Sequence, residues 1–182
     1  MANNKECHLV HFNYGQAAAK AEKWAARRVY LRLKVNFDPD LVHLHNIDIA
    51  GAVDVSQMNI GAYKEGSRVV YNRNGILLCL AVNYACANNI TDIVYGAVAD
   101  DVRDYPDCRK DFVERINAIS KIWGVNIHAP YIDTTKEDMK RELGDLPSYL
   151  LELTSSCYSP IQNGNNSWQP CKKCNSCVSN GF

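Results

Sequence analysis

The stretch LVHFNYGQAAAKAEKWAARRVYLRLKVNFDPDLVHLHNIDI, residues 9–49, decides the fold class. It opens with a short apolar run at residues 9–12, which predicts a β-strand ending at a turn. Residues 17–34 are rich in Ala, Arg, Lys and Leu and contain neither Gly nor Pro, which predicts a helix. Pro39 lies in the break that follows, and the alternation over residues 41–49 then predicts a second strand.

Strand and helix patterns continue to alternate over the rest of the chain. The expected elements are a long loop over 50–72, a buried helix over 75–88, a buried strand over 91–98, an amphipathic helix over 109–123, a short strand over 125–129 and a helix with a capping box at Thr134, Thr135 and Asp138. The amphipathic helix is expected to bury one face, which comprises Phe112, Val113, Ile116, Ile119, Ile122 and Trp123. Such alternation predicts an α/β fold, with a parallel sheet covered by helices.

The composition is that of an ordinary globular domain. The chain has 182 residues, of which 47% are hydrophobic and 22% charged, so one domain is expected. Twenty basic and twenty acidic residues cancel, so no overall field attracts nucleic acid or an anionic membrane. The first eight residues contain no apolar core of signal-peptide length, and no apolar run approaches a membrane span. We therefore expect a cytoplasmic protein without a nucleic-acid or membrane partner.

A cluster of cysteines near the end of the chain predicts a metal site. Cys171, Cys174 and Cys177 are each separated by two residues, and Cys157 can complete the set across a loop rich in Asn, Gly, Ser and Pro. This spacing is typical of a structural zinc ion with four thiolate ligands and no open position. An iron–sulfur cluster or a redox pair remains open as an alternative. A disulfide scaffold is not expected in a chain of this size.

Other residues are candidates for binding a ligand, each with a simpler alternative. Asp107 and Arg109 could offer an acceptor and donors to a purine-like edge, or could only form a turn and helix start. Lys136 could contact a phosphate or carboxylate, or be solvated. Asn72 and Arg73 could line a pocket or lie on the surface.

Five further residues have a functional and a simpler interpretation. Asp100 and Asp101 follow a predicted strand and could bind a metal or ribose, or be solvated. The thiol of Cys108 could be reactive or buried and inert. His43 and His45 alternate along a strand, and we expect them to be structural.

Several motifs together resemble one family, the 7-cyano-7-deazaguanine synthases of queuosine biosynthesis. The segment TSSCY at 154–158, the CKKCNSC segment at 171–177 and the terminal Gly-Phe are similar to that family's zinc tail. YPDCR at 105–109 is similar to its most distinctive internal motif, and Asn72-Arg73-Asn74 to a pocket segment. FNYGQ at 12–16, Pro130 and Lys136 follow the family's spacing.

The resemblance implies a Rossmann-like fold of the adenine nucleotide alpha hydrolase type and a homodimer. It also implies ATP-dependent adenylation of the carboxylate of 7-carboxy-7-deazaguanine, followed by conversion through an amide to the nitrile. The candidate ligand residues are Tyr14, Gln16, Asn72, Arg73, Asn74, Asp101, Tyr105, Asp107, Arg109 and Lys136. We expect residues 1–153 to form the α/β domain and residues 154–182 a zinc-binding tail packed on it.

The family's pyrophosphate loop, Ser-Gly-Gly-x-Asp-Ser, has no counterpart in the sequence. No two of the ten glycines are adjacent, and Ala17 and Ala18 replace basic residues of the family. Our first interpretation is therefore a protein that binds a purine, deazapurine or nucleotide without hydrolysing ATP, and that sequesters or senses it. The alternative is a 7-cyano-7-deazaguanine synthase, alone or as a subunit of a split enzyme. A protein-interaction scaffold is the third possibility.

Overall fold

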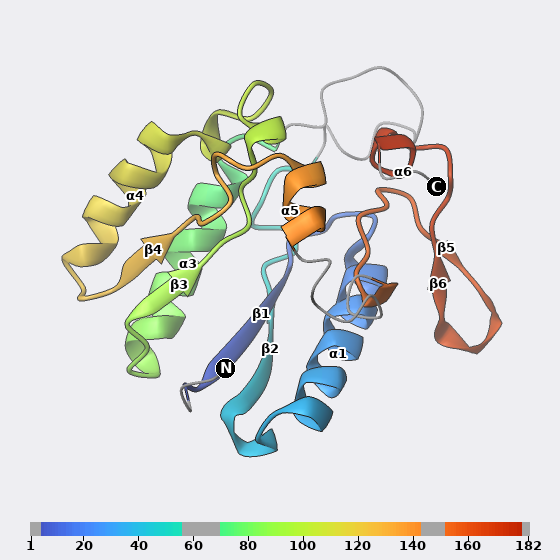
Figure 1. Cartoon of the computed structure of the whole chain (residues 1–182), viewed down its shortest axis with the longest axis horizontal. Helices are drawn as coiled ribbons and strands as arrows, with labels where there is room; N and C mark the ends of the chain where they lie inside the picture. Colours follow the sequence, from blue (N-terminus) through green and yellow to red (C-terminus); the bar gives the residue numbers. More distant parts are fainter. Residues whose placement is uncertain (1–4, 56–69, 143–151, 180–182) are drawn as a thin grey trace. The chain divides into compact units, whose positions relative to one another are not determined.

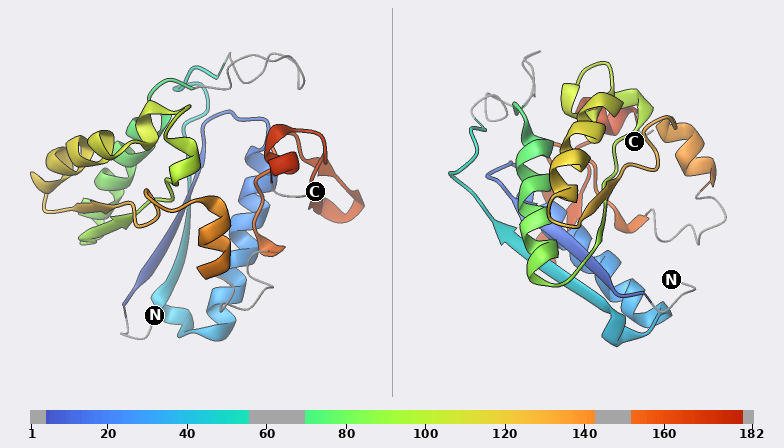
Figure 2. Two further views of the ribbon diagram at one scale, coloured as in Figure 1. Left: turned by 45° about the horizontal axis from the view of Figure 1, so that its top comes forward. Right: turned by 90° about the vertical axis from the view of Figure 1, so that its left-hand side faces the viewer.

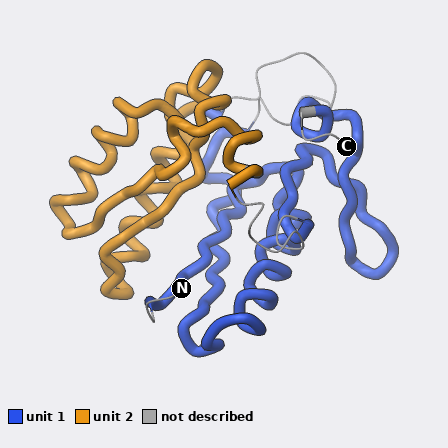
Figure 3. The backbone as a smooth tube through the Cα atoms, viewed as in Figure 1, with its two compact units in different colours: residues 1–70, 147–182 blue, residues 71–146 orange. Residues whose placement is uncertain are grey.

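A computed structural model describes residues 5–55, 70–142 and 152–179 (Figure 1). The chain divides into two compact units (Figure 3). Unit 1 comprises Met1–Val70 and Pro147–Phe182, and unit 2 comprises Tyr71–Leu146. Each unit is described by itself. The domain boundary expected between residues 153 and 154 stays a prediction.

Unit 1 begins with the predicted strand, helix and strand. These are β1 (Cys7–Asn13), α1 (Ala19–Asn36) and, after the short 3₁₀ helix η1 (Pro39–Leu41), β2 (Val42–Asp48). β1 and β2 pair in parallel from Cys7↔Val42 to Asn13↔Asp48, and α1 packs on both strands (Figure 1). The apolar run, the helix-favouring composition and the alternating pattern thus predicted these three elements correctly, within one or two residues at each end.

Small residues let α1 approach the strands closely. Ala18, Ala21 and Ala25 recur at intervals of three and four residues, so they form one stripe along the helix. All three are buried, and Ala21 has no exposed surface. On β2, Val42 is 1% exposed. The alanine-rich sequence therefore both favours the helix and determines which face of it is buried.

The last part of unit 1 contains short elements. β5 (Ile161–Gln162) and β6 (Trp168–Gln169) form an antiparallel hairpin, and α6 (Asn175–Ser179) follows. The hairpin tip is the 3₁₀ turn η6 (Gly164–Asn166), in which Asn165 has a φ of 69°. The loop expected between Cys157 and Cys171 is therefore partly ordered as a hairpin.

Unit 2 alternates helices with a second parallel pair of strands. Its elements are α3 (Arg73–Ala87), β3 (Asp92–Val94), the 3₁₀ helices η2 (Ala99–Asp101) and η3 (Pro106–Cys108), α4 (Lys110–Lys121), β4 (Asn126–His128) and α5 (Lys136–Glu142). β3 pairs with β4 in parallel, and α3 packs beside α4 (Figure 2). The core contains Leu78, Ile116 and Ile127, flanked by Val82, Ile93, Tyr95 and Phe112.

Two helix ends in unit 2 have local stabilising features. After α4, Gly124 has a φ of 73°, a left-handed conformation that glycine adopts readily. At the start of α5, the Thr135 hydroxyl donates to an Asp138 carboxylate oxygen at 2.7 Å and accepts from the Asp138 N–H at 3.1 Å. Thr135 is therefore the cap residue, and Asp138 bonds to its hydroxyl and not, as in a full capping box, to its backbone N–H.

Some of the burial predicted for unit 2 is wrong. The strand expected over 91–98 spans only three residues as β3, and Val94 is 70% exposed. Among the described residues β3 has one partner strand, so little covers it. In α3 only Gly75, Leu78 and Ala85 are buried, whereas a wholly buried helix was expected. Cys79 and Cys86 are exposed.

The apolar face predicted for α4 is shorter than expected. Ile116 is buried and Phe112 packs on the core, as predicted. Ile122 and Trp123, at 78% and 68% exposure, lie beyond the helix end at Lys121 and so leave its face. Ile119 is 56% exposed, and nothing among the described residues explains this.

The α/β class with parallel strands is confirmed by the two parallel pairs. The long loop expected over 50–72 lies mostly outside the described residues, and its described ends, 50–55 and 70–72, contain no strand and no helix. In the part of the chain that the structure describes, no helix is both long enough and apolar enough to cross a membrane.

Candidate metal centre and ligand site

The four predicted cysteines of unit 1 come together in one cluster. The Sγ atoms of Cys157 and Cys174 are 4.0 Å apart, and those of Cys171 and Cys177 are 3.9 Å apart. All four Sγ atoms lie within 4.8 Å of one another, and each residue is at most 7% exposed. A tetrahedral ion with metal–sulfur bonds of about 2.3 Å needs sulfurs about 3.8 Å apart. The cluster therefore has the size and shape of a four-thiolate metal centre.

Backbone N–H groups point at the sulfurs, as the two-residue spacing predicts. The Cys171 N–H donates to the Sγ of Cys157 at 3.2 Å, and the Cys174 N–H donates to the Sγ of Cys171 at 3.4 Å. Lys172 has a φ of 59°, which turns the chain sharply between the two cysteines. These bonds stabilise negative charge on the sulfurs.

The four thiols differ in acidity because they are packed together. Burial raises the pKa of Cys157 to about 12. Burial also opposes ionisation of Cys171, but the N–H groups of Lys173 and Cys174 outweigh it and lower its pKa to about 6. Four thiolates this close repel one another unless a cation lies among them. The prediction of a buried four-cysteine group suited to a metal is confirmed.

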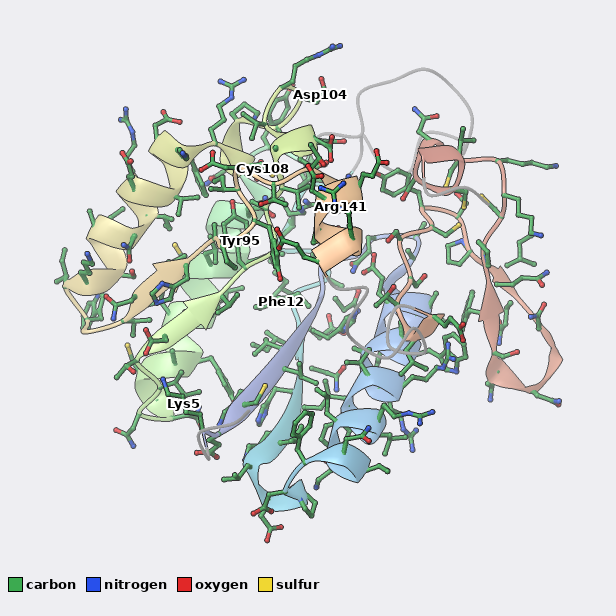
Figure 4. The ribbon with its side chains drawn as sticks, in the orientation of Figure 1. Lys5, Phe12, Tyr95, Asp104, Cys108 and Arg141 are labelled. Atoms are coloured by element: carbon green, nitrogen blue, oxygen red, sulfur yellow. The ribbon has the colours of Figure 1, made fainter. Side chains whose placement is uncertain are left out.

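Asp107 connects several predicted residues of unit 2. Its Oδ2 accepts the Asn74 backbone N–H at 2.9 Å, and its carbonyl oxygen accepts the Asn74 side-chain amide at 3.3 Å. The same carbonyl accepts the Tyr95 hydroxyl at 2.9 Å, and the Asn74 amide lies 3.4 Å from the Sγ of Cys108. Tyr95 and Cys108 are labelled in Figure 4. We call Asn74, Tyr95, Asp107 and Cys108 the Asp107 frame.

The first turn of α3 positions Asn74 for this frame. Asn72 precedes the helix in a left-handed conformation, with φ 54° and ψ 28°, which Asn tolerates better than most residues. A Cβ on Gly75 would lie 2.2 Å from Oδ1 of Asn72, so the glycine leaves room for that side chain. The Asn72-Arg73-Asn74 segment therefore forms the start of a helix, with Asn72 exposed.

A buried thiol lies at the centre of the frame. Cys108 is 5% exposed. Burial, followed by the charges of Asp107 and Asp101, raises its pKa to about 11, while Arg73 acts in the opposite direction. Of the two alternatives for Cys108, the inert thiol is the one that the structure favours. The same charges also show that Asp101 and Arg73 lie near the frame.

A second contact joins η2 to α5. Lys136 Nζ donates to Oδ1 of Asp101 at 2.9 Å, and the Lys136 backbone N–H donates to Oδ2 of Asp100 at 2.6 Å. Asp101 also accepts, through its carbonyl oxygen, the Tyr105 N–H at 3.0 Å. Lys136 is therefore half-buried and paired rather than free in solvent.

The remaining predicted residues have local partners. Arg109 is exposed, and its Nε donates to the Val102 carbonyl at 3.0 Å. Arg73 donates to Oδ1 of Asn74 at 3.4 Å. The structure thus groups Arg73, Asn74, Asp101, Tyr105, Asp107 and Lys136 in unit 2. Whether these residues bind a ligand stays a prediction.

Tyr14 and Gln16 belong to unit 1, in the turn between β1 and α1. Both are buried, at 6% and 4% exposure. The Gln16 amide accepts the Tyr14 N–H at 2.9 Å and donates to the Phe12 carbonyl at 3.0 Å and the Glu22 carboxylate at 2.6 Å. These bonds make Gln16 a residue that shapes the turn, and its predicted contact with a ligand stays untested.

Sequence reasoning missed Tyr95. Burial and the nearby charges of Cys108, Asp107 and Asp101 raise the pKa of its hydroxyl, so Tyr95 is a neutral donor at physiological pH. Its position at the end of β3, directly before Gly96, is the signal that could have identified it, because ligand sites in open α/β sheets lie at such strand ends.

Comparison with known proteins identifies the family. The profile described as "Queuosine biosynthesis protein QueC" matches residues 1–181. Proteins named 7-cyano-7-deazaguanine synthase are similar over most of the chain. That of Hahella chejuensis is 38% identical over 183 residues, which cover 96% of this chain and 75% of that protein. The protein of Alteromonas mediterranea is 36% identical over 183 residues, with 95% and 79% covered.

An archaeal relative shows the same pattern. The 7-cyano-7-deazaguanine synthase of Archaeoglobus fulgidus is 34% identical over 185 residues, which cover 95% of this chain and 73% of that protein. The chain is thus shorter than these relatives but matches them almost from end to end. On this similarity, the chain belongs to the QueC family of queuosine biosynthesis proteins.

Proposed function

We propose that the protein functions in 7-cyano-7-deazaguanine synthesis, as the synthase or as a subunit of one. The observation that supports this proposal is the similarity of the chain, over 94–96% of its length, to proteins named 7-cyano-7-deazaguanine synthase. This similarity favours the alternative interpretation, a synthase, over our first interpretation, a protein that only binds its ligand. Nothing in the comparisons supports a protein that binds its ligand without hydrolysing ATP.

The groups of unit 2 suit the chemistry that the resemblance implies. A substrate with a purine-like edge and a carboxylate needs both acceptors and donors from the protein. The Asp107 frame fixes a carboxylate and an amide against each other, and the cations Arg73 and Lys136 lie nearby on α3 and α5. We propose that Asn74 and Asp107 orient the deazapurine, while Lys136 contacts a carboxylate or phosphate.

An activity assay tests this proposal. The full chain is incubated with ATP, Mg²⁺, ammonia and 7-carboxy-7-deazaguanine, and both the nitrile and pyrophosphate are measured. If nothing forms, the assay is repeated with a second chain that carries the Ser-Gly-Gly-x-Asp-Ser loop. Product in either arm supports the proposal, and its absence in both arms contradicts it. Calorimetric binding of the substrate with no product in either arm would restore the first interpretation.

Asp107 offers a matched pair of variants for this assay. Asp107→Asn removes the charge that accepts the Asn74 N–H, and we expect activity to fall at least ~10-fold, about the effect of one charge-assisted hydrogen bond. Asp104→Asn is the control, because Asp104 lies in the same loop with its side chain 65% exposed (Figure 4). Equal activity in both variants would exclude Asp107 from the site.

We also propose that the metal of the four-cysteine centre is Zn²⁺ and that its role is structural. Four protein thiolates leave no position for a substrate or water, and zinc prefers the tetrahedral arrangement that the sulfurs offer. Metal analysis of the purified protein tests this. At least one equivalent of zinc, bound by the four cysteines, is expected, whereas iron with sulfide would indicate the iron–sulfur alternative.

The resemblance further motivates a Rossmann-like fold and a cytoplasmic homodimer. Each unit contributes a parallel strand pair with adjoining helices, which agrees with such a fold. Analytical ultracentrifugation of the purified protein tests the homodimer. A mass of about twice 20.4 kDa is expected, and a monomer at micromolar concentration would contradict it.

A further inference from the structure

A second group of metal-binding side chains lies in unit 1, at the beginning of β1 and β2. Glu6 precedes β1, His8 lies in β1, and His43 lies in β2. Figure 4 labels Lys5, just before β1, and Phe12 near the other end of the strand, so the group is at the Lys5 end. The Nε2 atoms of His8 and His43 lie 3.2 Å and 2.7 Å from the same Oε1 of Glu6.

The strand pairing brings these residues together. His8 pairs with His43 in the parallel register, although 34 residues separate them. Glu6 is two residues before His8, and side chains two apart along an extended chain point to the same side. The pattern Glu-x-His in one segment and a histidine opposite it in the next thus places three ligand-type groups on one face.

We propose that Glu6, His8 and His43 bind a divalent transition-metal ion, Zn²⁺ or one of similar preference, at a site separate from the four-cysteine centre. Their ligand atoms all lie within 4.8 Å of one another. An ion with bonds of about 2.0–2.1 Å to nitrogen and oxygen in tetrahedral geometry needs ligand atoms about 3.3 Å apart. The distance from His8 to Oε1 is therefore already suitable, and that from His43 must lengthen by about 0.6 Å.

The ligand nitrogens of the two histidines are buried. The Nε2 atoms of His8 and His43 have almost no solvent exposure, and the His8 side chain is only 12% exposed. Glu6, in contrast, is 56% exposed, so its carboxylate can move to meet an ion and leaves a path for the ion to enter. Two fixed ligands and one adaptable ligand suit capture of an ion from solution.

Ring stacking holds the histidines in place. The ring of His8 stacks on those of His43 and His45, with centroids 4.6 Å and 5.6 Å apart. Imidazole nitrogens bind a metal ion through their lone pairs, and the Glu6 carboxylate adds one negative charge to the site.

The donor set defines the class of ion. Two imidazoles and a carboxylate match borderline ions such as Zn²⁺ and Co²⁺, whereas Mg²⁺ and Ca²⁺ prefer oxygen ligands alone. Three protein ligands leave a fourth position for water, unlike the four-cysteine centre. The inference does not depend on the synthase proposal, because it uses none of the residues of unit 2.

Metal stoichiometry tests the site. The full chain is equilibrated by dialysis with buffered micromolar Zn²⁺ and analysed by mass spectrometry of the metal. We expect two equivalents for the wild type and one for the double variant His8→Ala/His43→Ala, with affinity for the second equivalent reduced at least ~10-fold. Glu6→Gln, an exposed change that should not affect folding, is expected to weaken the same equivalent.

Cobalt distinguishes the two sites. Co²⁺ bound by cysteines gives sulfur-to-metal charge-transfer bands, and Co²⁺ bound by nitrogen and oxygen does not. The variants should keep the charge-transfer bands, which also shows that they fold. The matched control is His128→Ala, since His128 pairs with Asp92 at 2.8 Å and is in no group of three ligand-type side chains among the described residues.

The proposal is overturned by either of two results. One is a wild type that binds a single equivalent at saturating micromolar Zn²⁺. The other is a second equivalent that persists in Glu6→Gln and in the double variant, or that is lost equally in His128→Ala.

Discussion

The four-cysteine centre and the Asp107 frame solve the problem of buried polar groups in opposite ways. In the first, four sulfurs lie within 4.8 Å and repel one another when ionised, so the arrangement depends on a cation. In the second, donors and acceptors satisfy one another: Asn74 and Tyr95 donate to Asp107. The four-cysteine centre should therefore lose its arrangement when its ion is removed, whereas the Asp107 frame should keep its hydrogen bonds without a ligand.

Breaking the metal centre is expected to have the largest effect. Cys177→Ala leaves three thiols for the ion, and we expect the zinc to be lost and the free energy of unfolding to fall by about 5 kcal/mol or more, since structural zinc contributes on the order of 10 kcal/mol in small domains. Zinc content and urea denaturation measure this. Cys79→Ala is the control, because that thiol is exposed and outside the cluster. An unchanged free energy of unfolding in the zinc-free variant would contradict the inference that the four-cysteine centre depends on its ion.

Loss of one hydrogen bond in the frame should cost less. Asp107→Asn weakens the bond to the Asn74 N–H, and we expect the free energy of unfolding to fall by about 2 kcal/mol, the range of bonds to charged groups. Urea denaturation next to Asp104→Asn, expected within ~0.5 kcal/mol of the wild type, provides the measurement. A loss as large as that of Cys177→Ala would mean that the two regions do not differ in how much stability one group contributes.

Thiol reactivity sharpens the comparison further. When the ion is removed the four-cysteine centre opens and the Cys171 thiol becomes accessible to solvent, whereas Cys108 stays buried with a pKa of about 11 and is almost entirely protonated at pH 7.5. We expect Cys171 to react with iodoacetamide at least ~10-fold faster than Cys108 in metal-free protein, because the thiolate is the reactive form and burial limits access to Cys108. The rate for Cys108 should rise as the pH approaches 11. Peptide mass spectrometry measures both rates, and equal rates would contradict the conclusion that Cys108 is a buried, inert thiol.

The smallest expected effect concerns the helix that carries Lys136. Thr135→Ala removes the side-chain oxygen that accepts the Asp138 N–H, and loss of such a cap costs about 1 kcal/mol. Thr134→Ala, one residue earlier, should cost less, because Thr134 is not the cap residue. Thermal denaturation compares the two. A larger loss for Thr134→Ala would place the helix start elsewhere.

Local patterns in the sequence predicted one region better than the other. The spacing of Cys171, Cys174 and Cys177 determines a ligand set within seven residues, and the structure confirms the cluster. The Asp107 frame joins residues 33 positions apart, and the hydroxyl of Tyr95 bonds to a backbone carbonyl, for which no side-chain pattern exists. Contacts that depend on how segments pack leave little trace in a single sequence.

The same limit explains the errors in the fold. Composition identified α1 and amphipathic periodicity identified α4, because both signals are local. Periodicity could not show that α4 ends at Lys121, which leaves Trp123 exposed, or that β3 has only three residues. It also missed the proximity of Glu6 to His43, which arises from the register of two parallel strands.

The hairpin between Cys157 and Cys171 has a practical consequence for protein engineering. Because β5 and β6 pair at Ile161↔Gln169 and Gln162↔Trp168, the two cysteines are held by the strands and not by the tip. The tip at Gly164–Asn166 can therefore accept a foreign peptide, such as an epitope or a fluorophore attachment sequence, while the base of the hairpin keeps the sulfurs in place. An inserted reporter there would supply none of the ligands of the metal centre.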